Sequence, residues 1–176
     1  KNSESNIEKT IRSVIEQNYK NLEYIIIDGK SSDGTLELIK KYKDKVSLII
    51  SEKDEGIWDA MNKGIKKAKG EIVGFLNADD FYNPDAVKIV NNYFNNHKID
   101  FLFGTVMKYK LMHGFNPWKI KLSFGFYTSH SVGFFIKLKK HMEVGLYNPK
   151  YLSADLDFFY KMIVNFNLKG ISTKKN

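Results

Sequence analysis

The sequence predicts an α/β fold in which helices flank a mostly parallel β-sheet. Two observations lead to this class. Short apolar runs of the kind that form buried parallel strands occur at residues 21–28, 45–51 and 71–76. Segments whose apolar residues recur at helical spacing lie before, between and after these runs. Strands that alternate with helices in this way build a sheet with right-handed crossover connections.

The first predicted helix covers residues 5–18, and the strand 21–28 follows it. The apolar residues of the helix share one face, and either Ser5 or Asn6 is suited to its N-cap. The strand is a continuous apolar run that ends at Asp28, as expected of a central parallel strand. Because the chain opens directly at a helix, we expect a preceding N-terminal strand that lies outside this sequence.

Two further alternations of helix and strand complete the first half of the chain. A helix over 31–44 begins with residues that favour N-caps and leads into the strand 45–51. A helix over 56–70 leads into the strand 71–76, and a helix over 83–96 follows with proline near its start. The predicted apolar faces contain Ile7, Ile11, Val14 and Ile15, then Leu36, Ile39 and Tyr42, then Ile57, Ala60, Met61, Ile65 and Ala68.

Length and composition limit the class of protein. The chain of 176 residues is 43% hydrophobic and 27% charged, which is typical of one soluble globular domain. It contains no cysteine, so disulfides and thiolate metal sites are excluded. With no apolar run near the roughly 18 residues of a transmembrane helix and no signal-peptide pattern, we expect a cytoplasmic protein. The net charge of +8 is concentrated in residues 101–142, which hold seven lysines and no acid and therefore suit an anionic partner.

Polar residues follow two of the predicted strands. Asp28 ends one strand, and Asn77, Asp79 and Asp80 come directly after another. In α/β sheets, ligands bind beyond the carboxyl ends of the strands. Adjacent carboxylates repel each other, whereas Mg²⁺ or Mn²⁺ takes one or two carboxylates and completes its shell with phosphates and water. The pair therefore predicts a divalent-cation site; the alternative is that residues 77–80 cap the next helix.

Three segments resemble, in their order and spacing, the motifs of a known family. They read DGKSSDGT (28–35), DEGIWDAMNKGIKKAKGE (54–71) and FLNADD (75–80). Together they resemble glycosyltransferase family 2, the inverting nucleotide-sugar transferases with a GT-A fold, whose usual forms are of the type DDGSTDGT, N.G...ARN.GI..A.GE and FLDADD. The version GIWDAMNKGI is similar to the branch that builds bacterial surface polysaccharides. The resemblance spans about residues 2–90 and implies a Rossmann-like GT-A sheet.

The first two segments contain three residues to which the resemblance gives a role. Asp28 matches an aspartate that contacts the base or ribose of the nucleotide, and Asp54 and Asn62 match positions that line the nucleotide pocket. Gly29 stands where the family often has a second aspartate. The local alternatives are that Asp28 forms a cap or an Asx-turn, and that Asp54 or Asn62 merely caps or decorates its helix.

The third segment matches the metal motif of the family. The resemblance implies that Asp79 and Asp80 hold Mn²⁺ or Mg²⁺, and that Asn77 and Asp79 contact the nucleotide sugar. Asn77 replaces the first acidic residue of the motif, and its side chain can still hydrogen-bond a ribose hydroxyl. Which of the two carboxylates touches the ion stays open.

A late segment, LSADLDFFYKMI (152–163), lies where the family has its general base. An inverting transfer needs a base that takes the proton from the acceptor hydroxyl. The resemblance implies this role for Asp155, with Asp157 as the frequent second acid, although Ala154 replaces the usual glutamate. The alternative is that Ser153 or Asp155 is the N-cap of a helix whose dipole favours Asp157. The predicted apolar stripe of this helix is Leu156, Phe159, Tyr160 and Ile163.

Residues 101–135 point to the acceptor. They contain ten aromatic residues interleaved with lysines, part of which must form core. Aromatic faces stack on sugars, and lysines suit diphosphates or anionic lipid headgroups. We therefore expect a saccharide or lipid-linked acceptor met at the inner face of the membrane, and no nucleic-acid partner. His130 resembles a family histidine that approaches a phosphate or the sugar; the alternative is a structural histidine.

The predicted organisation is a single GT-A catalytic domain, with a nucleotide-sugar-binding half at 1–98 and an acceptor-binding half at 99–176. The predicted function is that of an inverting, metal-dependent glycosyltransferase, and a UDP-sugar is the family's commonest donor. The alternative function is a nucleotide-binding α/β module without catalysis. A dinucleotide-dependent oxidoreductase is disfavoured because no G-x-G-x-x-G follows a strand.

Overall fold

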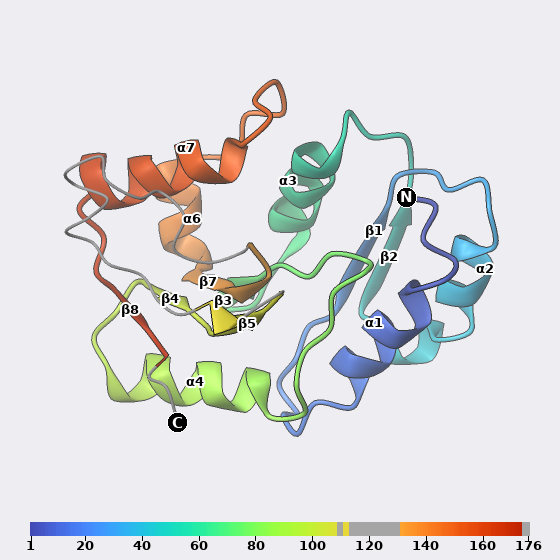
Figure 1. Ribbon diagram of the computed structural model, residues 1–176, viewed down its shortest axis with the longest axis horizontal. Helices are drawn as coiled ribbons and strands as arrows, with labels where there is room; N and C mark the ends of the chain where they lie inside the picture. The colour runs from blue at the N-terminus through green and yellow to red at the C-terminus, as the bar shows by residue number, and fades with distance from the viewer. Residues whose placement is uncertain (109–110, 113–130, 174–176) are drawn as a thin grey trace. The chain divides into compact units, whose positions relative to one another are not determined.

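The computed structural model of the protein describes residues 1–108, 111–112 and 131–173 (Figure 1). The chain divides into two compact units. The first unit comprises Lys1–Gly70 and Leu76–Ile89, and the second comprises Glu71–Phe75 and Val90–Asn176. The predicted halves of the catalytic domain stay a prediction.

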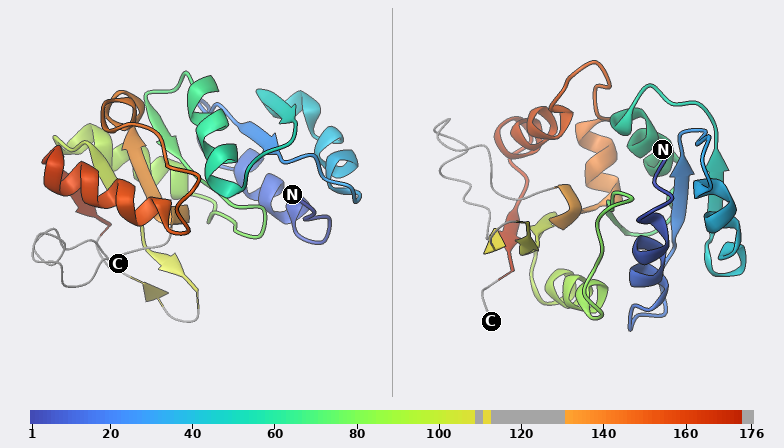
Figure 2. Two further views of the ribbon diagram at one scale, coloured as in Figure 1. Left: turned by 90° about the horizontal axis from the view of Figure 1, so that it is seen from above. Right: turned by 45° about the vertical axis from the view of Figure 1, so that its right-hand side comes forward.

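The first unit is built on two parallel strands, β1 and β2. Ile25 pairs with Leu48, and Asp28 at the end of β1 pairs with Ser51 at the end of β2. Figure 2 shows this pair, in blue to cyan, from two further sides. The predicted elements are confirmed with shorter bounds. They are α1 (Ile7–Ile15), β1 (Ile25–Asp28), α2 (Thr35–Lys40), β2 (Leu48–Ser51) and α3 (Ile57–Lys67), with a short 3₁₀ turn at Lys43–Lys45.

Helices cover both faces of β1. Successive residues of a strand point to opposite faces. Ile26 packs in a buried cluster with Ile7 and Ile11 of α1 and Ile39 of α2. The neighbouring residue, Ile27, faces α3, where an added Cβ at Gly64 would lie 3.6 Å from its Cγ1. The first unit is therefore a three-layer α/β arrangement, as the sequence predicts.

Two details of these helices differ from the expectations. Asn6 takes the N-cap position of α1, but in the described structure its side chain makes no capping hydrogen bond. Ile57 was expected on the apolar face of α3 but is 49% exposed, because it is the first residue of the helix. Farther along α3, Ile65 is buried, in agreement with the predicted face.

The second unit contains a mixed four-stranded sheet in the order β3-β7-β4-β8. β7 runs antiparallel to both β3 and β4, whereas β4 and β8 are parallel. An apolar run does not specify the direction of the strands that pair with it. The sequence therefore predicts the strand β3 but not its antiparallel pairing with β7. The elements are β3 (Ile72–Gly74), β4 (Phe101–Phe103), β5 (Val106–Met107), β6 (Leu111–Met112), β7 (Phe134–Lys137), α6 (Leu138–Val144), α7 (Ala154–Tyr160) and β8 (Gly170–Ser172). The boundary between the units falls inside α4 (Ala86–Asn96).

Aromatic side chains dominate the core of the second unit. Phe101, Phe103 and Phe134 are fully buried, and the Phe159 ring of α7 lies 4.8 Å from that of Phe134. Phe158, which was not in the predicted stripe of α7, is also buried, whereas Tyr160 is 40% exposed. The predicted stripe is therefore wrong at Tyr160: the helix turns its Phe158–Phe159 side to the sheet.

The aromatic residues of 101–135 fall into two groups. Those of the described residues, Phe101, Phe103, Phe134 and Phe135, are buried core residues. The others, including Phe115, Trp118, Phe124 and Phe126, lie outside the described residues, as does His130. In the described ranges, none of the helices has the length and apolar character that a bilayer crossing requires.

Candidate functional site

Asp28 lies at the end of β1 and is almost completely buried, at 2% exposed. Its carboxylate accepts hydrogen bonds from the backbone N–H of Ser31 (3.0 Å), the hydroxyl of Ser51 (2.7 Å) and the hydroxyl of Ser31. Burial alone would raise the pKa of Asp28, but the hydrogen bonds from Ser31 and Ser51 outweigh it and hold the pKa below its ordinary value. Asp28 is therefore an ionised anchor of the 28–31 turn, as the local alternative expects. A contact with a nucleotide stays a prediction.

Asp54 lies beside the turn that Asp28 organises. A Cβ atom added to Gly29 would overlap the carboxylate of Asp54, with Oδ1 at 3.0 Å and Oδ2 closer. The carboxylate of Asp54 thus occupies the space where the family often has the side chain of a second aspartate. Asn62 lies in α3, the helix that follows Asp54, and is buried. Asp28 and Asp54 are 26 positions apart in the sequence, and the fold brings both to the carboxyl end of the parallel strands β1 and β2.

The segment 77–80 forms a turn that α1 holds in place. The side-chain amide of Asn77 donates to Asp80 Oδ2 at 3.0 Å, and the backbone N–H of Asp80 donates to the carbonyl of Asn77 at 3.1 Å. The buried hydroxyl of Thr10 lies 2.9 Å from the carbonyl oxygen of Ala78 and 2.8 Å from that of Asp80. Because α4 begins only at Ala86, these residues do not cap the next helix. The capping alternative is therefore wrong.

The carboxylates of Asp79 and Asp80 fit one kind of cation site. Asp79 is exposed, and Asp80 is half-buried with one oxygen engaged by Asn77. Among the described residues, no three acidic or histidine side chains converge on a point that could hold a metal ion. The pair suits an ion such as Mg²⁺ or Mn²⁺ that takes one or two protein carboxylates and obtains its other ligands from phosphates and water.

The second unit contains Asp155, the second residue of α7. Its Oδ1 accepts the backbone N–H of Leu156 at 3.0 Å, and the side chain is half-buried. Burial raises the pKa of Tyr147, and the negative charge of Asp155 raises it further. Asp157 forms an ion pair with Lys161 at 2.6 Å. Ser153 holds the N-cap position, so Asp155 is not the N-cap of α7.

Sequence reasoning missed the residues that support the predicted ones. Ser31 and Ser51 hold Asp28, and Thr10 holds the 77–80 turn. Ser31 belongs to the 28–31 turn itself and could have been found from the Asx pattern. Thr10 is 68 positions from Ala78, and a threonine within a helix gives no local signal of such a contact.

Residues 1–152 match the family model of glycosyl transferase family 2. The chain belongs to glycosyltransferase family 2. A similar relative is the putative teichuronic acid biosynthesis glycosyltransferase TuaG of Bacillus subtilis, 32% identical over 90 residues, which are 49% of this chain and 36% of TuaG. The matched part of this chain thus covers little more than a third of the length of TuaG.

Two solved structures resemble this family-2 chain in fold. TarS 1–349 of S. aureus, in complex with UDP, superposes with a TM-score of 0.80 at 20% identity, covering 99% of this chain and 56% of that one. The mannosyltransferase PcManGT of Pyrobaculum calidifontis, in complex with GDP-Man and Mn²⁺, superposes with a TM-score of 0.75 at 18% identity, covering 96% and 51%. The GT-A fold expected from the motifs is confirmed.

Proposed function

We propose that this chain is the catalytic part of an inverting glycosyltransferase of bacterial surface polysaccharide synthesis. It transfers a sugar from a nucleoside diphosphate sugar, most simply a UDP-sugar, to a saccharide or lipid-linked acceptor. The observation that carries the proposal is the family match over residues 1–152, within which Asp28 ends β1 and Asp54 and the 77–80 turn follow β2 and β3. The similarity to TuaG, a putative teichuronic acid biosynthesis glycosyltransferase, and the complex of TarS with UDP support the choice of pathway and donor.

The first unit contributes the donor site. Asp28, fixed by its serines, holds the turn against which the nucleoside packs. Asp54, Asn62 and Asn77 supply hydrogen-bonding groups for the nucleotide sugar. The carboxylate of Asp54 is an acceptor and therefore suits an N–H or O–H group of the nucleoside.

Asp79 and Asp80 would hold Mn²⁺ or Mg²⁺, which supplies positive charge that stabilises the diphosphate leaving group. The fit of the residues supports this assignment: two adjacent carboxylates are available, one exposed and one partly engaged by Asn77. The Mn²⁺ in the complex of PcManGT is consistent with such an ion in this fold.

Asp155 acts as the general base. It takes the proton from the acceptor hydroxyl as that oxygen attacks the anomeric carbon and the bond to the diphosphate breaks. The second acid of α7, Asp157, forms an ion pair with the Lys161 ammonium. Asp155 lies just beyond the residues that match the family, so its role rests on the motif and on its place in α7.

We also infer that the acceptor is met at the inner face of the membrane, with the protein in the cytoplasm. The seven lysines of 101–142 favour contact with anionic lipids. Leu152 and Tyr151, next to α7, are 96% and 51% exposed and suit the lipid headgroup region. Sedimentation with anionic and with neutral vesicles tests this contact, and equal binding to both would contradict it.

The test of the function is turnover of nucleotide sugars. We expect the chain to release UDP from a UDP-sugar, slowly to water and faster with a matching acceptor, when Mn²⁺ or Mg²⁺ is present. Thermal shift separates the alternatives: a nucleoside diphosphate sugar should stabilise the protein with the metal present, and NAD should have no effect. Binding without turnover under any condition would favour the non-catalytic nucleotide-binding module.

A further inference from the structure

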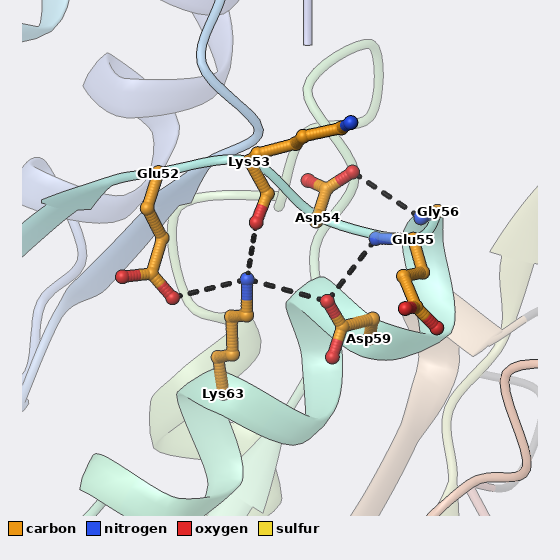
Figure 3. Close-up of polar contacts among 7 residues, drawn as sticks. All are labelled: Glu52, Lys53, Asp54, Glu55, Gly56, Asp59 and Lys63. Atoms are coloured by element: carbon orange, nitrogen blue, oxygen red, sulfur yellow. Dashed lines mark hydrogen bonds and ion pairs between the residues drawn. The ribbon is translucent and has the colours of Figure 1, made fainter.

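Lys63 of α3 contacts both ends of the loop between β2 and α3: Glu52 and Lys53 on one side and Asp59 on the other (Figure 3). Its ammonium lies 2.7 Å from the carbonyl oxygen of Lys53, 3.0 Å from Glu52 Oε1 and 3.2 Å from Asp59 Oδ2. An ammonium has three N–H donors, so these three acceptors use its full capacity. The Lys63 side chain is 21% exposed and that of Asp59 is 26% exposed, whereas Glu52 is 55% exposed.

The loop that Lys63 spans has further hydrogen bonds of its own. Asp59 Oδ2, which contacts Lys63, also accepts the backbone N–H of Glu55 at 3.1 Å. Asp54 Oδ1 accepts the backbone N–H of Gly56 at 3.2 Å, and Gly56 has a φ of 113°, a conformation that favours glycine. Lys63 therefore holds the residue before Asp54 directly and the residue after it through Asp59.

Gly29 completes the arrangement from the other side. Because it has no Cβ, the carboxylate of Asp54 can lie against its backbone, next to the buried Asp28. Its backbone is not in the left-handed region, so alanine would fit its conformation and would displace the Asp54 side chain only. The position of this carboxylate thus depends on Lys63 on one side and on the absence of a side chain at residue 29 on the other.

We propose that Lys63 and Gly29 are positioning residues for the donor site, which together place the carboxylate of Asp54 beside Asp28. This inference rests on the proposed function, in which Asp54 contacts the nucleotide. Lys63 need not touch the donor: its contacts are all within its own loop and helix. Its ammonium contacts the carboxylates of Glu52 and Asp59, whereas that of Asp54 accepts the backbone N–H of Gly56.

A first experiment tests the arrangement without any ligand. Amide hydrogen exchange of Glu55 and Gly56 is measured by NMR in the full chain, in Lys63→Met and in Lys67→Met, an exposed lysine of the same helix that serves as control. We expect the two amides to exchange at least about tenfold faster in Lys63→Met than in the parent, because one charge-assisted contact is worth about that factor. Unchanged exchange in Lys63→Met would overturn the proposal.

A second experiment asks whether Lys63 acts through Asp54. UDP affinity with Mn²⁺ is measured for Lys63→Met, Asp54→Asn and the double variant. We expect each single variant to bind about tenfold more weakly, and the double variant to bind no more weakly than Asp54→Asn alone. If the losses of UDP affinity in the two single variants multiply in the double variant, Lys63 does not act through Asp54. If Lys63→Met binds UDP as tightly as the parent, the proposal is overturned directly.

Gly29→Ala provides a variant that leaves the Lys63 contacts intact. We expect a melting temperature close to that of the parent with a loss of UDP affinity, because the end of a flexible side chain is all that must move. Full affinity in Gly29→Ala would contradict the proposal. The failures are distinguishable: a parent chain that binds neither UDP nor GDP overturns the proposed function, whereas the exchange of Glu55 and Gly56 tests the arrangement of the loop independently.

Discussion

Asp28 and Asp79 differ in how far the protein already uses their oxygen atoms. Asp28 is buried and accepts three hydrogen bonds from two serines, so most of its roughly four acceptor positions are taken. Asp79 is exposed and lies in a turn. At a strand end, a carboxylate that accepts several hydrogen bonds from the protein organises the loop, whereas an exposed carboxylate is available to a ligand. The motif predicts both residues as binders and does not distinguish these roles, since Ser51 belongs to β2 and reaches Asp28 only through the fold.

The available carboxylates are expected to bind the metal. We predict that Asp79→Ala and Asp80→Ala each abolish the Mn²⁺-dependent part of UDP binding and leave the fold intact, because the diphosphate then lacks its bridging ion. Titration calorimetry with Mn²⁺ and with EDTA measures that part, and the exposed Asp85→Ala is the control. If both variants bind UDP with Mn²⁺ as tightly as the parent, the metal site is elsewhere.

His141 is an unusual residue of the second unit. It is fully buried, stacks on Phe158 with ring centroids 4.3 Å apart, and neither ring nitrogen makes a hydrogen bond within the described part of the chain. Burial lowers the pKa of His141 from 6.5 to about 4. Between these pH values the unfolded chain binds a proton that the folded unit does not, so the free energy of unfolding falls as the pH is lowered from about 6.5 to about 4.

We predict that His141→Phe removes this pH dependence and stabilises the protein, because it replaces a buried polar ring by an apolar one of similar size. The stability advantage of the variant should grow on acidification by an amount of the order of 3 kcal/mol. Urea unfolding at several pH values measures it, with His97→Phe, at an exposed histidine, as control. An advantage that does not change with pH would mean that His141 is protonated in the folded protein.

At the scale of elements, the sequence predicts well which helices and strands form, and poorly which of them pack or pair with one another. The helices and strands of the first unit are found within the predicted ranges, because the period of the apolar residues reports the local structure. The face that α7 turns to the sheet was misassigned at Tyr160, since Phe158 and Phe159 are adjacent and either pattern fits a helix of seven residues. The antiparallel pairing of β3 with β7 joins segments about 60 residues apart and leaves no mark in either.

Helix α7 presents Asp155 and Asp157, and the structure separates their environments. We predict that Asp155→Asn lowers the transfer rate by at least about a hundredfold, the scale of a lost general base, with little change in donor affinity. Asp157→Asn should cost less, because that carboxylate is paired with Lys161. Turnover and UDP affinity are measured in parallel. If Asp155→Asn lowers only the melting temperature, the residue supports the helix and Asp157 becomes the first candidate for the base.

Two glycines in different elements are predicted to respond in opposite directions to alanine. In α3, a Cβ at Gly64 would make an ordinary 3.6 Å contact with Ile27, so Gly64→Ala should raise the free energy of unfolding by about 0.5–1 kcal/mol. In β8, a Cβ at Gly170 would overlap the ring of the fully buried Phe101, so Gly170→Ala should lower it by about 1–3 kcal/mol. Urea denaturation decides, and equal effects would contradict both packing arguments.

At the scale of the molecule, the three motifs predict the family and the GT-A fold, and both are confirmed. Motifs carry this information because each combines a strand end with polar residues in a fixed order. The boundaries of the two units were not predicted: they assign β3, which precedes the 77–80 turn, to the unit that contains Asp155. A strand's neighbours in sequence do not determine which sheet it joins.

This division leads to a prediction about ligand binding by the whole chain. Because the proposed donor-site residues Asp28, Asp54 and Asp79 all belong to the first unit, UDP with Mn²⁺ should slow amide exchange most in the turns 28–31 and 54–56 and around 77–80. At a ligand concentration of about 100 times the Kd, binding stabilises the bound form by about 2.7 kcal/mol, so amides that exchange only after the site opens should slow by about a hundredfold. Amides of 154–163 serve as the internal comparison. Stronger protection there than in the three turns would place the nucleotide in the second unit and overturn the assignment of the donor site.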